Sequence, residues 1–144
     1  MDQDLTHYIA QRLSEDCLKD VGGNVQYDSS SPNQVVIRGY TFSFLNDRGV
    51  MKIVLDGNEG GLRTIFSDIS GRSGPVSDPI ISTINVSKKR HEGDYSVRVQ
   101  LTKQAFSRSA PGGLESLQSR IYLAVREKVI NPILNSVLGK GLDR

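Results

Sequence analysis

The chain has 144 residues, which suits one domain with its own core, and its 18 basic and 16 acidic side chains leave a formal charge of +2. So small a net charge does not predict a nucleic-acid or membrane partner from bulk electrostatics. Cys17 is the one cysteine, so an intrachain disulfide is excluded. No apolar run reaches the roughly 18 residues of a membrane helix, and the acidic start lacks a secretory signal pattern. We therefore expect one domain over residues 1–144, with no membrane contact, in the cytoplasm or assembled from it into a particle.

The first element is an amphipathic helix predicted over residues 4–21. Its apolar residues recur at steps of three and four: Leu5, Tyr8, Ile9, Leu13 and Cys17. Asp4 has a side chain suited to capping the helix start, and Gly22-Gly23 suits its end. Cys17 lies on the apolar side, where we expect it to pack as a small hydrophobe.

From Gln34 the apolar period changes to two, which predicts strands. Val35 and Ile37 share one parity, whereas Phe42 and Phe44, with Tyr40, share the other. A bulge at Gly39 between the two sets would return both to one face of a sheet.

The segment Asn46–Gly49 is predicted to be a hairpin loop, with Gly49 at a positive φ. Alternating apolar residues at 51, 53 and 55 predict the next strand. The glycine-rich run 56–61 is interpreted as a loop that leads into a strand around 62–69.

Residues 70–79 are predicted to form the longest loop, and Ile80, Ile84 and Val86 to form the strand that follows it, with Ser82 interrupting the apolar face. A turn then leads to the clearest strand of the chain. In that strand every second residue is apolar: Tyr95, Val97, Val99 and Leu101.

Helical spacing returns over residues 114–130. Asn131-Pro132 predicts a kink or a fresh turn, which would continue through Leu138 and end at Gly139. The whole pattern predicts the α+β class, with an antiparallel β-meander of about five strands and an N-terminal and a C-terminal helix packed on it.

Residues able to carry chemistry are few and scattered. His7, His91 and Cys17 do not match the local spacing of a zinc site, and no serine lies in a G-x-S-x-G elbow. The run from Asp56 begins like a calcium loop but has Gly60 and Ser67 at two ligand positions. We expect no catalytic site, no metal and no cofactor.

The dense basic cluster of the chain, Lys88-Lys89-Arg90-His91, lies at a predicted hairpin tip. The simplest interpretation is a solvated, charged turn. The same side chains, with Arg72, have the charge to contact phosphates or an acidic patch of a neighbouring subunit. Gly71–Gly74 matches the GXXG loop of KH domains only formally, because prolines and a strand follow it.

By exclusion, the sequence favours a non-catalytic interaction or assembly module. We expect a subunit of a larger protein assembly, with a homo-oligomer as the first expectation and a viral or phage structural component, part of a virion, as one example. The alternative is a nucleic-acid-binding domain that uses the basic tip with Arg72, Lys140 and Arg144.

Overall fold

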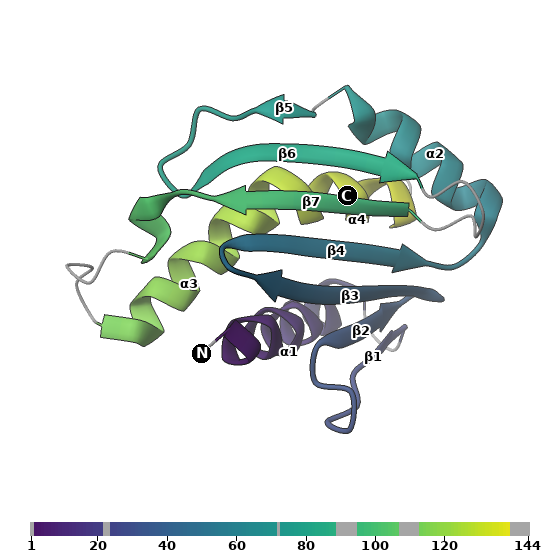
Figure 1. The fold of residues 1–144 in the computed structure, drawn as a ribbon. Coiled ribbons are helices and arrows are strands. Elements are labelled where there is room, and N and C mark those ends of the chain that lie inside the picture. Colours follow the sequence, from purple (N-terminus) through teal and green to yellow (C-terminus); the bar gives the residue numbers. More distant parts are fainter. Residues whose placement is uncertain (1, 22–23, 72, 89–94, 107–112, 139–144) are drawn as a thin grey trace.

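The alternating segments of the chain form one antiparallel sheet in the computed structural model, which describes residues 2–21, 24–71, 73–88, 95–106 and 113–138 (Figure 1). Within these ranges the strands are β1 (Val25–Gln26), β2 (Gln34–Ile37), β3 (Tyr40–Asp47), β4 (Val50–Asp56), β5 (Gly74–Pro75), β6 (Ile81–Lys88) and β7 (Tyr95–Leu101). Their order across the sheet is β1-β2-β3-β4-β7-β6-β5. The α+β class is confirmed. The described strands number seven rather than five, and they do not form a simple meander, because β7 lies between β4 and β6.

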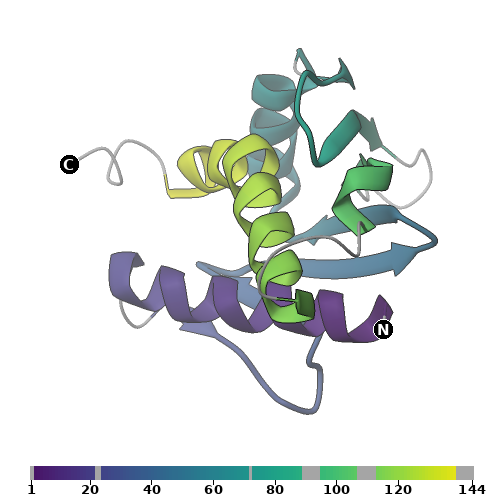
Figure 2. The same cartoon turned by 90° about the vertical axis from the view of Figure 1, so that its left-hand side faces the viewer.

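Helices lie along one face of this sheet (Figures 1 and 2). They are α1 (Asp2–Val21), α2 (Glu59–Ser70), α3 (Gly113–Val125) and α4 (Asn131–Leu138), with a short 3-10 turn, η1 (Lys103–Phe106). Helix α1 packs against β2 and β3, and α2 packs against α4. The prediction for the first helix is confirmed over its length, but Asp4 is not its cap, because the helix already begins at Asp2.

The connection between β2 and β3 is a tight turn and not the predicted bulge. Ile37 pairs with Tyr40, and the two residues between them have positive φ, 52° at Arg38 and 87° at Gly39. Positive φ at both positions is the mark of a type I′ hairpin, whose twist matches that of the strands. Because the chain reverses here, Val35 lies opposite Phe42, so both apolar sets do share one face as expected.

The β3–β4 connection repeats this design. Asp47 pairs with Val50, and the turn consists of Arg48 at φ 51° and Gly49 at φ 86°. The predicted hairpin and the positive φ of Gly49 are confirmed, whereas Asn46 and Asp47 belong to the strand.

Residues 59–70 form helix α2, so the strand predicted around 62–69 is wrong. Asn58 caps this helix, its Oδ1 accepting a hydrogen bond from the Gly61 N–H at 3.0 Å. Apolar side chains at helical spacing are buried along it: Leu62, Ile65, Phe66 and Ile69. The cap and this spacing outweigh the low helix propensity of the two glycines in the first turn.

The C-terminal helical segment changes direction between α3 and α4, and α4 begins at Asn131, where a kink or a fresh turn was predicted (Figures 1 and 2). A π-helical turn over Arg126–Ile130 joins α3 to α4, and the Asn131 N–H donates to the Arg126 carbonyl, five residues back. Proline has no N–H and its ring crowds the preceding turn, so a wider turn before Pro132 accommodates it. The predicted stop at Gly139 lies outside the described residues.

The core lies between the helices and the inner face of the sheet. Cross-strand pairing aligns the buried strand residues in three lines: Val35, Phe42, Leu55 and Tyr95; Phe44, Ile53 and Val97; and Met51, Val99 and Ile84. Ile121, Val125, Ile130 and Ile133 from the C-terminal helices belong to the same core cluster. The four residues predicted as the apolar face of β7 are all buried.

Candidate functional site

The basic tip predicted from the sequence lies almost wholly outside the described residues. Strand β6 ends at Lys88, whose backbone is opposite Tyr95. Lys89, Arg90, His91 and Arg72 lie outside the described ranges, as do Lys140 and Arg144. Their role in binding phosphate or a neighbouring subunit stays a prediction.

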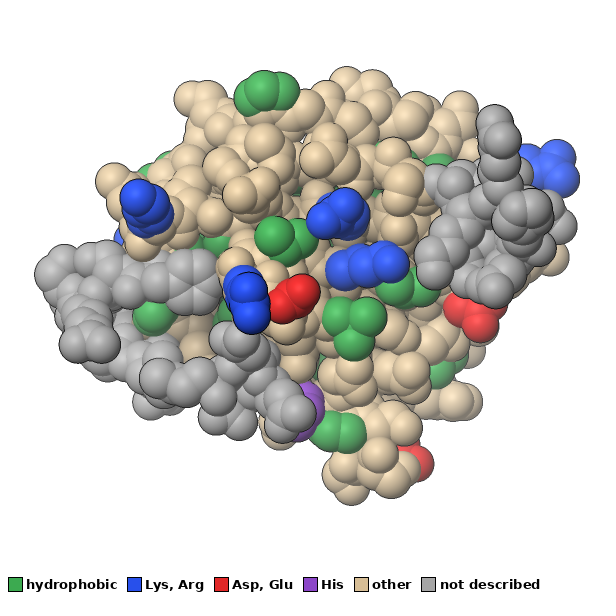
Figure 3. Space-filling model, in the orientation of Figure 1, with side chains coloured by type: hydrophobic (Ala, Val, Ile, Leu, Met, Phe, Trp, Pro, Cys, Tyr) green, Lys and Arg blue, Asp and Glu red, His purple; other side chains and the backbone are tan. Residues whose placement is uncertain are grey.

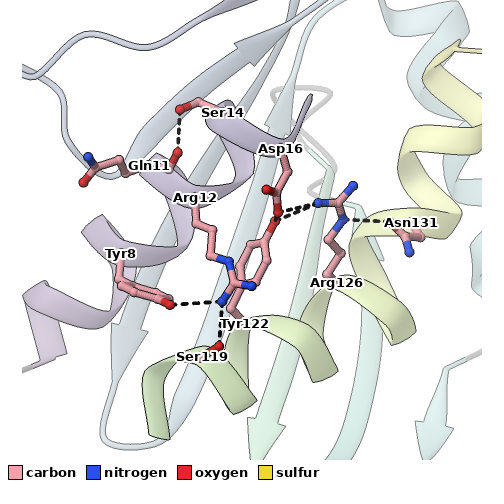
Figure 4. A network of polar contacts seen from close by, with 9 residues as sticks. All are labelled: Tyr8, Gln11, Arg12, Ser14, Asp16, Ser119, Tyr122, Arg126 and Asn131. Atoms are coloured by element: carbon pink, nitrogen blue, oxygen red, sulfur yellow. Dashed lines mark hydrogen bonds and ion pairs between the residues drawn. The ribbon is translucent and has the colours of Figure 1, made fainter. Parts of the chain in front are cut away.

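Helices α1 and α3 are joined by a polar network (Figure 4). Arg12 Nη1 donates to Tyr8 Oη at 3.0 Å and to Ser119 Oγ at 2.7 Å, and its guanidinium lies 4.5 Å from the centre of the Tyr122 ring. These contacts include a cation–π interaction, which strengthens as water is removed. They fix the position of one helix on the other.

The same network continues through the Tyr122 hydroxyl, which donates to Asp16 Oδ2 at 2.6 Å. Arg126 Nη1 donates to both partners, at 2.7 Å to Asp16 Oδ2 and 2.9 Å to Tyr122 Oη. Burial, followed by the hydrogen bond to Asp16, raises the pKa of Tyr122 well above its ordinary value. The phenol is therefore a neutral donor at physiological pH, which suits a structural tie between helices.

A shallow hollow of about 290 Å³ lies between α2 and the strands β6 and β7. Its floor includes Phe66 and Tyr95, whose rings stack with centres 4.6 Å apart. Val86, Arg63 and three serines complete the lining. The volume is at the lower limit for small-molecule sites, which span roughly 300–1,000 Å³.

The face of the sheet opposite the helices carries no described helix, and we call it the open face (Figure 1). Three lines of paired side chains cross its four central strands, β3, β4, β7 and β6: Gln34, Ser43, Val54, Ser96 and Ser87; Leu45, Lys52, Arg98 and Asn85; and Asp47, Val50, Gln100 and Thr83. A shorter line, Val36, Thr41 and Asp56, crosses β2, β3 and β4 on the same face. None of these residues is aromatic. Most are short and polar, as on the solvated side of an antiparallel sheet.

The second of the three longer lines, the charged line, differs from the other two. It places Lys52 of β4 directly opposite Arg98 of β7. Figure 3 shows basic side chains in the middle of the face, with one acidic side chain beside them. Leu45, 47% exposed, lies next to Lys52 on β3. Like charges at directly opposed positions destabilise a sheet. The arrangement therefore presents two adjacent cations and an apolar side chain to solvent at some cost in stability.

Sequence reasoning missed the charged line. The parity of each strand assigns Leu45, Lys52 and Arg98 to the outward side, and that signal was readable. Their alignment depends on β4 pairing with β7, and no local pattern specifies that pairing.

The described residues contain no group of three or more His, Cys, Asp or Glu side chains placed to hold a metal ion. In the same ranges, no helix has the length and apolar character needed to cross a membrane. Comparisons with models of protein families, with curated proteins and with solved structures found no match for this chain.

Proposed function

We propose that the chain is a non-catalytic binding module, a subunit of a larger assembly, which attaches to an acidic region of another protein through the open face. The observation that carries the proposal is the cross-strand pair Lys52–Arg98 with Leu45 beside it. An acidic partner would relieve the repulsion between the two cations and cover the exposed leucine. Interfaces combine an apolar anchor with complementary charge in this way.

The edges of the sheet favour the face as the binding surface. The outermost strands, β1 and β5, have two residues each, and β5 includes Pro75, which has no N–H to offer. Short edge strands and proline prevent another strand from adding to a sheet. On β6, past the residues that pair with β5, the Val86 N–H already donates to Ser73 Oγ at 3.0 Å. This N–H is therefore engaged and does not offer a pairing site to another strand.

Charge also favours a different chain over a second copy of this one. A two-fold contact centred on Lys52 and Arg98 would bring these cations against their own equivalents, and like charges across an interface are unfavourable. The homo-oligomer expected from the sequence is therefore one outcome of the test. Nucleic acid is another, and it receives little support here because the three lines offer no aromatic side chain for bases to stack on.

Photo-crosslinking from defined positions tests the proposal. A benzophenone amino acid replaces Leu45 in the protein as its own cells produce it, and the matched control carries it at Leu123 of α3, which is 51% exposed against 47% for Leu45. We expect a covalent adduct with an acid-rich segment of another protein from position 45 and none from position 123. Lys52→Glu/Arg98→Glu should abolish that adduct.

Four results would overturn the proposal. They are no adduct from position 45, an adduct that survives charge reversal, an adduct with a second copy of the chain, and an adduct with nucleic acid. Thermal unfolding of Lys52→Glu/Arg98→Glu establishes that the variant is folded. If it is not, Lys52→Gln/Arg98→Gln takes its place.

A further inference from the structure

Resting on the proposed function, we infer that the acidic partner segment is an α-helix that lies across the strands, parallel to the charged line, with two carboxylates one turn apart. The first support is the direction of that line. Leu45, Lys52 and Arg98 belong to three neighbouring strands at paired positions, so the line runs perpendicular to the strands and not along one of them.

Spacing is the second support. Neighbouring strands lie about 4.8 Å apart, so Leu45, Lys52 and Arg98 follow one another at that interval. On a helix, residues three or four apart have Cβ atoms about 5–6 Å apart on one face. An apolar residue at position i with acids at i+4 and i+7 therefore matches Leu45, Lys52 and Arg98 in order. An extended segment places same-side residues about 6.8 Å apart, which loses register with the cations after one step.

Room on the sheet is the third support. The line beside the cations consists of Gln34, Ser43, Val54, Ser96 and Ser87. Ser43 and Val54 are short and half-buried, whereas Ser96 is buried, so a helix resting on Ser43 and Val54 would have its acidic side next to Lys52, with Arg98 one strand further along. The charged line crosses four strands, about 14 Å from β3 to β6, which corresponds to about ten residues of helix.

The end of the charged line supplies a further polar contact. Asn85 of β6 is exposed and pairs with Arg98. Its amide can donate to and accept from a polar side chain one turn beyond the second acid. The recognition pattern is thus an apolar residue, two acids and a polar residue, each one helical turn after the last.

Synthetic peptides test the geometry on the intact protein. The first is an alanine-based helix of about fifteen residues with Leu, Glu and Glu at i, i+4 and i+7. A matched control has the same composition with the second Glu on the opposite side of the helix, and another has two central prolines that interrupt the helix. By fluorescence anisotropy at low salt, we expect the first peptide to bind at least about threefold more tightly than either control, because each exposed ion pair contributes modestly.

A charge exchange makes the test specific to the two cations. A peptide with Lys in place of both Glu should bind Lys52→Glu/Arg98→Glu and not the natural protein. Equal binding of helical and interrupted peptides would overturn the helix, and failure of the charge exchange would overturn the pairing. If no peptide binds while position 45 still crosslinks an acidic segment, this inference is wrong and the proposed binding face stands.

Discussion

The two faces of the sheet are built from the same strands and differ at every second residue. On the covered face, Phe44 and Ile53 pair beneath the helices and are fully buried. On the open face, their chain neighbours Leu45 and Lys52 pair in solvent. The covered face contains what folding requires, and the open face carries a pair of cations that folding disfavours. A feature that works against stability and faces solvent is a better guide to binding than any feature of the core.

Two adjacent residues of β3, Phe44 and Leu45, test the difference between the two faces most directly. Phe44→Ala should lower the free energy of unfolding by about 3–5 kcal/mol, because it removes a buried ring and leaves a cavity. Leu45→Ala, one residue along, should change it by about 0.5 kcal/mol or less. Urea unfolding of the two variants measures both values, and similar losses would mean that the faces are assigned wrongly.

The next effect concerns the network that holds α1 to α3 over the covered face. Tyr122→Phe removes a hydroxyl that bonds to Asp16 and Arg126, both of which remain. We expect a loss of about 1.5–3 kcal/mol in the free energy of unfolding, the range for hydrogen bonds to charged groups. Tyr8→Phe is the matched control, because its hydroxyl accepts a single bond from Arg12 and it should cost less.

The stability deficit of Tyr122→Phe should also depend on pH. The pKa of Tyr122 is raised in the folded protein, chiefly by burial, from an ordinary value near 10. Below about pH 10 the phenol is protonated whether folded or unfolded; above it only the unfolded state loses the proton, so stability falls as pH rises. The phenylalanine that replaces it has no such proton, so the deficit of Tyr122→Phe should be smaller at pH 11 than at pH 8. An unchanged deficit would contradict the raised pKa.

Replacing the arginine in each of the two turns that set the strand register is expected to raise the free energy of unfolding slightly. Arg38 and Arg48 occupy the first position of type I′ turns at φ near 50°, where asparagine is favoured over arginine. Arg38→Asn and Arg48→Asn should each raise the free energy of unfolding by about 0.5 kcal/mol. Gly39→Ala and Gly49→Ala should lower it, since both glycines have φ near 87°. Register matters because a slip of one residue would exchange the two faces.

These turns also show how far the sequence could be interpreted. Alternation identified the inward residues of β2, β3, β4 and β7, because burial on one side of a strand has a period of two. Alternation placed a bulge at Gly39, where the structure has a tight turn. A bulge and a chain reversal both return the apolar residues on either side to one face, so the pattern alone does not distinguish them. For α2, the spacing of its buried residues was readable as a helix, but the glycine-rich run 56–61 favoured a loop followed by a strand over 62–69.

The candidate site was beyond prediction for a different reason. Lys52 and Arg98 become neighbours only because the chain crosses over through α2 and returns with β7 beside β4. That placement depends on tertiary packing and not on the residues near either cation. The basic cluster at 88–91 was conspicuous because its members are adjacent in sequence. Lys52 and Arg98 are also close to each other, but only across paired strands, so the sequence does not show them as a cluster.

Replacing Lys52 should have a small effect on stability, and it tests whether this side chain serves binding or the fold. Because this residue opposes Arg98 across β4 and β7, Lys52→Gln should raise the free energy of unfolding by roughly 0.2–1 kcal/mol at low salt. The gain should shrink as salt screens the repulsion. The matched control is Lys19→Gln on the exposed side of α1, which should leave stability within about 0.5 kcal/mol.

The same Lys52→Gln variant should bind the acidic helical peptide more weakly while being the more stable protein. Stability and binding then move in opposite directions at one residue, which is the signature of a group kept for a partner and not for the fold. Urea unfolding and peptide anisotropy on a single preparation measure both. A stability loss on replacing Lys52 would show instead that its side chain supports the sheet, and the two faces would then differ less than their burial suggests.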